Sequence, residues 1–220
     1  MNSRTLKDSI YGEFAVLSKA LAAPKRLELL ELLTQCPRSV EALADQTAIT
    51  IANASQHLKV LRAARLVDAE KRGLNVVYRL AGEDVAHAVL TLRRLAESRY
   101  HAMRETRRLF LEERNQLESV TPEELLKRIR EGAVTLIDVR PPEEYAAGHL
   151  KGALNIPITE FKKRLQPLKK RTEIVAYCRG PYCVMALDAV QILRKNGYRA
   201  QALDFGVVEM RSLGLSIATG

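Results

Sequence analysis

Apolar residues in the first half of the chain recur every three or four positions, in short runs separated by turn residues. This spacing is typical of amphipathic helices and predicts helices over residues 4–22, 24–33, 40–45 and 51–64. Pro24 suits the first position of the second helix, and Ser39 and Thr50 suit the N-caps of the next two. Short helices joined by a few residues, the last capped by a hydroxyl, indicate a helix-turn-helix.

The pattern then changes from helical to strand-like spacing. Residues 66–71 and 76–80 are rich in β-forming side chains, and a turn over residues 72–75 that contains Gly and Asn separates them, so we expect a hairpin. A hairpin that follows a helix-turn-helix is typical of a winged helix. From residue 83 to about residue 117 the spacing is helical again and predicts one long helix.

In the second half of the chain, strand-like and helix-like runs alternate. We predict strands at residues 134–138, 173–177 and 200–203, and helices at residues 143–147 and from about residue 184. Thr121, Pro122 and Glu124 form a capping box for a helix that ends at Gly132. The alternating order predicts a parallel sheet with helices on both faces. We therefore expect a multidomain fold: a mainly-α winged helix-turn-helix domain over residues 1–118 and an α/β domain over residues 119–220.

The composition of the chain indicates the class of protein and the cell compartment. The chain has 220 residues, 47% of them hydrophobic, and no apolar run is long enough to span a bilayer. The N-terminus lacks the apolar core of a signal peptide, so we expect a cytoplasmic protein without a membrane partner. Three cysteines are too few for a disulfide framework; a close pair indicates redox, sulfur or metal chemistry instead.

Positive charge is concentrated where a helix-turn-helix and its wing would meet DNA. Residues 50–80 hold six basic and two acidic residues, an excess of four that equals the net charge of residues 1–118. Basic side chains there would contact phosphates, and short polar side chains near the start of the helix would reach base edges. The candidate DNA-binding residues are Thr50, Asn53, Ser55, Gln56, His57, Lys59, Arg62, Lys71 and Arg72.

Four stretches of the first half carry a family resemblance: PKRL at residues 24–27, SQHLKVL at 55–61, ARLV at 64–67 and VYRL at 77–80. Through them, residues 10–100 resemble the ArsR family of winged-helix repressors. Arg65 departs from the family, which usually has Gly in the turn before the wing. The resemblance implies a homodimer, formed by the first and last helices, on a double-stranded DNA operator, because operator dyads demand a dimer.

Two of the three cysteines lie in one loop between a predicted strand and a predicted helix. Cys178 follows the strand, and Cys183 stands five positions later. A strand–loop–helix turn gathers backbone N–H groups and the positive end of a helix around one point. We therefore expect Cys178 to have a depressed pKa and to act as a thiolate. The candidate catalytic residues are Cys178, Arg179, Gly180, Pro181, Tyr182, Cys183 and Val184.

Motifs around this loop carry a second resemblance: LIDVR at residues 136–140, EEY at 143–145, GHLKGA at 148–153 and NIP at 155–157. Together with the loop they make residues 119–217 similar to a single-domain rhodanese. The resemblance implies a persulfide on Cys178, formed without a cofactor from a sulfane-sulfur donor such as thiosulfate or a persulfide, with Arg179 holding an anionic donor. Phosphatases of the same fold need Arg six positions after the cysteine, and Val184 stands there, so we exclude a phosphatase.

Other positions support or depart from the rhodanese pattern. Asp138, Arg140 and His149 belong to the segments around the loop, and we expect Asp138 and Arg140 to form an ion pair rather than to perform chemistry. The family often has Gly-Gly and Trp near the C-terminus, where this chain has Asp-Phe-Gly at residues 204–206 and Met210. This departure implies altered packing beside the loop.

Two roles remain open for Cys183: a small apolar residue that packs under the loop, or the partner that resolves a persulfide through a disulfide or a bridged polysulfide. We expect no metal site, because a soft metal needs two or three thiolates and the first half holds Cys36 alone. A zinc site between subunits at His87 and His101, with Asp84 beside His87, is the weaker alternative.

The leading hypothesis is a dimeric transcriptional repressor whose rhodanese domain forms a persulfide on Cys178 and senses or transfers sulfane sulfur. A second hypothesis is a sulfurtransferase enzyme whose winged helix serves dimerisation or autoregulation. A third is a repressor that responds to metals or metalloids. The basic helix and wing argue against the second, and the missing thiolate cluster argues against the third.

Overall fold

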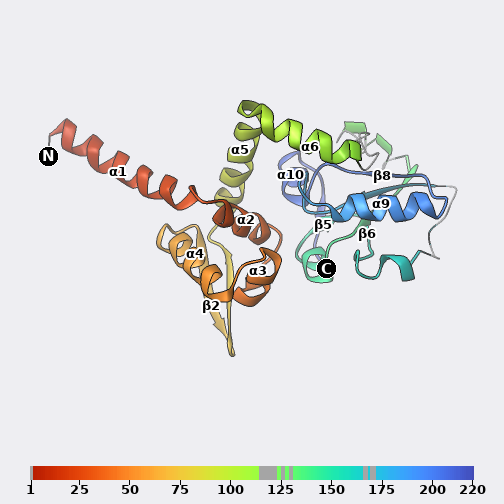
Figure 1. The fold of residues 1–220 in the computed structure, drawn as a ribbon, viewed down its shortest axis with the longest axis horizontal. Coiled ribbons are helices and arrows are strands. Elements are labelled where there is room, and N and C mark those ends of the chain that lie inside the picture. The colour runs from red at the N-terminus through yellow and green to blue at the C-terminus, as the bar shows by residue number, and fades with distance from the viewer. Residues whose placement is uncertain (1, 114–122, 125–126, 129–130, 166–167, 169–171) are drawn as a thin grey trace. The chain divides into compact units, whose positions relative to one another are not determined.

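The computed structural model describes residues 2–113, 123–124, 127–128, 131–165, 168 and 172–220 (Figure 1). The chain divides into two compact units, which are residues 1–93 and residues 94–220. We call them the first unit and the second unit.

Capped helices make up most of the first unit. They are α1 (Ser3–Leu21), α2 (Pro24–Leu33), α3 (Val40–Gln46), α4 (Ile51–Ala63) and the start of α5 (Glu83–Arg99). Pro24 is the first residue of α2, as predicted. Ser39 Oγ accepts a hydrogen bond from the backbone N–H of Ala42 at 3.3 Å, and Thr50 Oγ1 accepts one from that of Asn53 at 3.2 Å. These two caps confirm where the sequence places the starts of α3 and α4.

The wing is an antiparallel hairpin, as predicted. Its strands are β2 (Val67–Arg72) and β3 (Asn75–Leu80), and β1 (Arg38–Ser39) pairs with the other edge of β3. The register pairs Arg72 with Asn75, so Gly73 and Leu74 form a two-residue turn in which Gly73 has a φ of 62°. The strand β1 was not predicted, because two residues are too few to show a period. Arg65, just before the wing, has a φ of 58°, the left-handed conformation that Gly adopts most easily.

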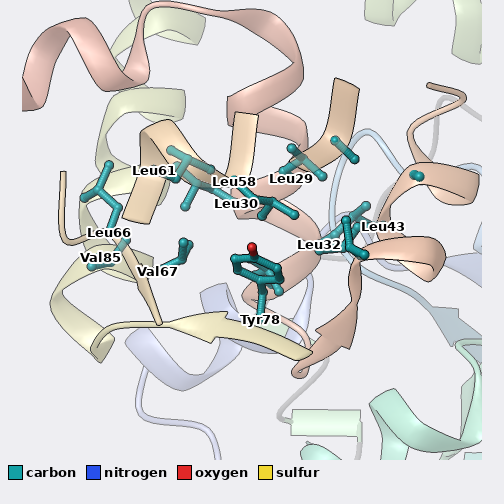
Figure 2. Packing of buried hydrophobic residues seen from close by; sticks show 14 of the residues in the cluster. Leu29, Leu30, Leu32, Leu43, Leu58, Leu61, Leu66, Val67, Tyr78 and Val85 are labelled. Atoms are coloured by element: carbon teal, nitrogen blue, oxygen red, sulfur yellow. The ribbon is translucent and has the colours of Figure 1, made fainter. Parts of the chain in front are cut away.

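Leucines of three helices pack against the hairpin to form the core of the first unit (Figure 2). The fully buried ones are Leu29, Leu30, Leu43, Leu58 and Leu61, and Tyr78 of β3 lies among them. Each such leucine contributes roughly 1.5–3 kcal/mol through burial. Because α4 turns Leu58 and Leu61 into this core, its opposite face is left exposed.

A parallel sheet is the centre of the second unit, as predicted, and it has a fourth strand, β6, beyond the three that the sequence indicated. Its strands run in the order β6-β4-β7-β8. The elements of this unit are α6 (His101–Glu113), β4 (Val134–Asp138), α8 (Pro142–Ala147), β5 (His149–Leu150), β6 (Leu154–Asn155), the 3-10 helix η1 (Phe161–Lys163), β7 (Glu173–Tyr177), α9 (Met185–Lys195), β8 (Ala200–Ala202), α10 (Val207–Ser212) and β9 (Ile217–Ala218). Strands β5 and β9 pair separately as an antiparallel ribbon.

Helices cover both faces of the parallel sheet, which confirms the expected layering. Ile137 and Ile174 point into a core shared with α9, whereas their neighbours Leu136 and Val175 point into a core shared with α10. The alternation follows from the two-residue period of a strand. Because it follows the last residue of β7, the loop between β7 and α9 lies at the carboxyl edge of the sheet, where ligands bind in folds of this class.

The prediction of one unbroken helix from residue 83 to residue 117 is wrong. Helix α5 ends at Arg99, α6 begins at His101, and Tyr100 between them is not helical. The Arg104 guanidinium donates to the carbonyl oxygens of Glu97 at 2.5 Å and Ser98 at 3.1 Å. A continuous helix would use these carbonyls for the backbone N–H groups one turn further on, so a side chain takes the place of the helical hydrogen bonds.

Two further sequence predictions concern helices. The predicted capping box includes Thr121 and Pro122, which lie outside the described residues. Gly132 has a φ of 64°, the left-handed conformation that commonly follows the last residue of a helix. Among the helices that the structure describes, none is both long and apolar enough to cross a membrane.

Candidate functional site

The predicted DNA-binding residues of α4 lie along its exposed face. Asn53, Gln56, Lys59 and Arg62 are exposed and recur every three positions, so they form one stripe on the helix. Ser55 and His57 are half-buried at the edges of this stripe. Thr50 uses its hydroxyl to cap the helix, which leaves it less free to contact a base. The exposed stripe contains no acidic side chain.

The wing presents exposed basic residues, some of which are paired within it. Lys71 and Arg72 are exposed near the turn. The Arg72 guanidinium lies 2.9 Å from a Glu70 carboxylate oxygen, and Arg79 lies 2.8 Å from Asp68. Exposed pairs of this kind contribute only about 0–1 kcal/mol, so phosphate oxygens can replace these carboxylates at little cost.

The loop over residues 178–184, which we call the cysteine loop, folds around its two thiols. Cys178 directly follows β7 and is 1% exposed, whereas Cys183 is half-buried. The Cys178 Sγ–H donates to the carbonyl oxygen of Cys183 at 3.3 Å. Backbone N–H groups of Gly180 and Ala186 donate to the Cys178 sulfur, as expected for a strand–loop–helix turn. Gly180 has a φ of 142°, a conformation that other residues rarely adopt.

The prediction that Cys178 has a depressed pKa is wrong. Complete burial raises its pKa well above the ordinary value, and the hydrogen bond between the two sulfurs raises it further, against the opposing effect of the N–H groups. The same sulfur–sulfur hydrogen bond lowers the pKa of Cys183 to about 7, with help from the backbone N–H groups of Arg179 and Met185. Of the two thiols, Cys183 therefore ionises more readily than Cys178.

The Arg179 guanidinium is paired with the carboxylate of Glu144, a residue that was not among the predicted site residues. Its guanidinium donates to Glu144 through Nη2 at 2.5 Å and through Nε at 3.0 Å and 3.1 Å. Glu144 is fully buried at the start of α8. The pair raises the pKa of Arg179 despite burial, so the guanidinium stays charged. The EEY motif contained Glu144, but nothing in the sequence indicated that it reaches a residue 35 positions away.

The segment after β8 packs directly under the cysteine loop. A Cβ on Gly206 would lie 2.0 Å from the Arg179 carbonyl oxygen, so only Gly fits there. Glu209 accepts a hydrogen bond from the Gly206 N–H at 3.1 Å. Hence Gly206, one of the residues that depart from the rhodanese pattern near the C-terminus, lies against the loop backbone.

The supporting residues hold the sheet edge together. Asp138 and Arg140 form the predicted ion pair at 2.6 Å, almost fully buried, and Arg140 also donates to the Gly148 carbonyl at 2.7 Å. His149 Nδ1 lies 2.8 Å from the Tyr145 carbonyl oxygen, and the two rings stack at 3.6 Å. These contacts assign all three predicted residues a positional role in the described structure.

The second unit also holds the cysteine loop against the end of α5 and against α6. The Tyr182 hydroxyl donates to a Glu97 carboxylate oxygen at 2.5 Å. Arg107 of α6 donates to the Pro181 carbonyl at 3.4 Å and forms an ion pair with Asp204. These contacts leave no pattern in the sequence, because the partners lie 74 to 97 positions apart.

The third cysteine lies in the first unit. Cys36 is buried in the first unit, apart from the cysteine loop in the chain. Within the described part of the chain, no three His, Cys, Asp or Glu side chains converge so that they could hold a metal ion.

Comparisons with known proteins agree with this architecture. The model of the helix-turn-helix domain family matches residues 21–70, and that of the rhodanese-like domain family matches residues 121–212. The HTH-type transcriptional regulator Rv0324 from Mycobacterium tuberculosis is 42% identical over 214 residues, which cover 97% of this chain and 94% of that protein.

Two further relatives each match one half. The human thiosulfate:glutathione sulfurtransferase is 34% identical over 92 residues, which cover 36% of this chain and 80% of that enzyme. The solution structure of a homodimeric winged helix-turn-helix DNA-binding domain from Mycobacterium bovis is 35% identical, covers 46% of this chain and 93% of that one, and has a TM-score of 0.43.

Proposed function

This chain belongs to the HTH-type transcriptional regulators that join an ArsR-type winged helix to a rhodanese-like domain, and we propose that it is a repressor controlled by sulfane sulfur. In this proposal a persulfide forms on Cys178 and changes the affinity of the winged helix for its operator. The observation that carries it is the pairing of the two cysteines in one loop: the Cys178 Sγ–H donates to the Cys183 carbonyl oxygen at 3.3 Å, and the lowered pKa of Cys183, about 7, leaves this thiol partly ionised at neutral pH.

The first unit supplies DNA binding. The exposed stripe on α4 enters the major groove, where Asn53 and Gln56 meet base edges, while Lys59 and Arg62 meet phosphates. The basic residues of the wing contact the flanking backbone.

A second copy of the chain completes the operator-binding form. Leu6, Ile10, Phe14 and Leu17 of α1 are between 43% and 60% exposed and recur on one face of the helix. An apolar stripe of this length is unfavourable in water, and a two-fold copy of the same helix would cover it. Two-fold symmetry would then present two α4 helices to the two halves of a palindromic operator.

The second unit supplies the sulfur chemistry. The Cys183 thiolate takes the proton of Cys178 through their hydrogen bond, and the Cys178 sulfur attacks the outer sulfur of thiosulfate. The S–S bond of thiosulfate breaks, its electron pair leaves with sulfite, and the new S–S bond makes the Cys178 persulfide. The N–H groups of Gly180 and Ala186 stabilise the negative charge on the sulfur.

The added sulfur supplies the signal. Cys178 is almost fully buried, so a further sulfur atom must displace part of the cysteine loop. Tyr182 and Pro181 of this loop contact Glu97 of α5 and Arg107 of α6, so a displaced loop changes these contacts. Helix α5 continues into the first unit, and regulation requires that the modified loop favour one arrangement of the dimer over the other.

Operator release by a sulfur donor tests the proposal. Fluorescence anisotropy would follow the purified full-length protein on a labelled duplex from its own promoter, before and after thiosulfate or polysulfide. We expect release from the wild type and from Cys36→Ser, a thiol control outside the loop, but not from Cys178→Ser. Equal release by Cys178→Ser would refute the proposal, and release by arsenite or zinc alone would indicate a metal-responsive repressor.

A sulfurtransferase enzyme is the second candidate, favoured by the low pKa of Cys183 and by the similarity to the human sulfurtransferase. Thiocyanate production from thiosulfate and cyanide, combined with no measurable operator affinity, would favour this candidate. Operator affinity that responds to the donor would favour the repressor.

A further inference from the structure

A cavity of about 510 Å³ lies beside the cysteine loop, within the second unit. Met103, Thr106 and Phe110 of α6 form one wall, and Pro181, Cys183 and Leu187 form the other. Small-molecule sites in proteins have volumes of roughly 300–1,000 Å³, so this cavity has room for a small organic ligand. The sulfur chemistry proposed above assigns it no role.

The lining selects against an anion. Most of the side chains around the cavity are apolar. Among the described residues that line it, Arg107 carries the charge. Its guanidinium is ion-paired with Asp204 and donates to the Pro181 carbonyl. A thiosulfate dianion would lose its hydration in such surroundings without an equivalent replacement, whereas an apolar body would gain from burial.

The two thiols differ in their access to this cavity. Cys183 lines it and is half-buried, whereas Cys178 does not line it and is 1% exposed. A ligand in the cavity therefore meets Cys183 first. Its pKa of about 7 allows Cys183 to react as a thiolate there at neutral pH.

We infer that the cavity binds an apolar thiol as the acceptor of the sulfane sulfur, and that Cys183 relays the sulfur from Cys178 to this acceptor. The inference rests on the proposed persulfide at Cys178 and adds the class of its acceptor. It also gives Cys183 a second reaction, besides its role as the base for Cys178.

Both transfers conserve atoms and charge. In the first, the Cys183 thiolate attacks the outer sulfur of the Cys178 persulfide; the bond from this sulfur to the Cys178 sulfur breaks, and the electron pair stays on Cys178 as a thiolate. In the second, the acceptor thiolate attacks the same sulfur on Cys183. The acceptor leaves as an organic persulfide, and Cys183 returns to a thiolate.

Acceptor kinetics on preloaded protein test the inference. The full-length protein is first loaded with thiosulfate until its mass shows one added sulfur, and is then mixed with benzyl mercaptan or with cyanide. We expect the ratio of the rate constants for benzyl mercaptan and cyanide to fall about 30-fold in Thr106→Trp, because the indole occupies the space of the phenyl ring. Leu109→Trp, an exposed change on the same helix outside the cavity, keeps the wild-type ratio.

A second variant tests the relay. Because Cys183→Ser lacks the base proposed for Cys178, this variant is loaded with excess donor at alkaline pH until its mass shows one added sulfur, and is then returned to the pH of the wild-type assay. We expect its sulfur to remain on Cys178 when benzyl mercaptan is added, whereas the preloaded wild type transfers it to the thiol. Failure of the wild type to load would count against the proposed persulfide itself. Normal loading with an unchanged ratio in Thr106→Trp would overturn the apolar acceptor site.

Three other outcomes would also overturn the inference. Transfer at the wild-type rate from Cys183→Ser would remove the relay. Release of sulfide without an acceptor, leaving a protein two hydrogens lighter than its unloaded, reduced form, would show that Cys183 closes a disulfide with Cys178 instead. A change in sedimentation in Thr106→Trp but not in Leu109→Trp would assign the cavity to a second copy of the chain.

Discussion

Replacing Glu144 with Gln should destabilise the second unit far more than an ordinary surface substitution. Glu144 is fully buried and accepts three hydrogen-bond contacts from the Arg179 guanidinium, which is itself 19% exposed. Gln keeps the size of the side chain and one acceptor oxygen but removes the negative charge. The variant therefore leaves a guanidinium with little access to water and without its carboxylate partner.

The structure sets the size of this effect. Removing one partner of a buried ion pair typically costs about 3–5 kcal/mol, and the partial exposure of Arg179 places the expected loss near the lower end, at about 3 kcal/mol. With a urea dependence of roughly 2 kcal/mol per molar, the midpoint of unfolding would fall by about 1.5 M. The freed guanidinium would also lower the pKa of Cys183 further, because its positive charge favours the thiolate.

Urea unfolding of the full-length protein, followed by circular dichroism, measures this loss. Glu160→Gln is the matched control, because Glu160 pairs with Arg164 at a site where both side chains are more than half exposed, and we expect a change below about 0.5 kcal/mol. The double variant Glu144→Leu with Arg179→Met should recover most of the loss, since an apolar pair can replace a buried ion pair. Equal stability of Glu144→Gln and Glu160→Gln would show that the buried Glu144–Arg179 pair contributes no more than the exposed Glu160–Arg164 pair.

Three further predictions concern the thiols, the loop packing and DNA. The rate at which iodoacetamide alkylates the cysteine loop should rise with pH and reach half its maximum near pH 7, because the Cys183 thiolate is lost as pH falls through its pKa. In Cys183→Ser this midpoint should move above pH 8.5. Mass spectrometry of the loop peptide would measure both midpoints. Gly206→Ala should cost about 1–3 kcal/mol in thermal unfolding, because its Cβ meets the Arg179 carbonyl; no loss would contradict the close approach. Lys59→Ala should weaken operator binding and reduce the salt slope by about 1, and an unchanged slope would exclude a phosphate contact.

Local chemistry made the first unit largely predictable. Ser39 and Thr50 cap the helices that the sequence assigned to them, and Arg65 adopts the left-handed conformation that its place before the wing requires. Such features depend on neighbours within four residues, so they can be recognised without the fold. The break at Tyr100 was missed because it depends on which carbonyls the Arg104 side chain selects.

In the second unit, the sequence located the reactive loop but not its electrostatics. The βα alternation placed Cys178 at the carboxyl edge of the sheet, and Val184 at the position where a phosphatase of this fold needs Arg argued against that activity. The prediction for the thiolate was wrong, because the pKa depends on burial and on the second sulfur as well as on the N–H groups of the turn. Glu144, Glu97 and Asp204 were missed as partners of the loop and of α6, because contacts across 35 to 97 positions leave no local pattern.

Residue patterns alone were enough to recognise a winged helix-turn-helix followed by a rhodanese-like α/β domain, the polar stripe of α4 and the two cysteines of one loop. These follow from periodicity, capping and the identity of a few residues, all of which act over short distances along the chain. The folded structure was needed to show that the pKa of Cys183 is lowered, that Arg179 is held by Glu144, and that an apolar cavity opens beside Cys183. Charge and accessibility depend on how much water remains around a group, and that is set by segments that meet only when the chain folds.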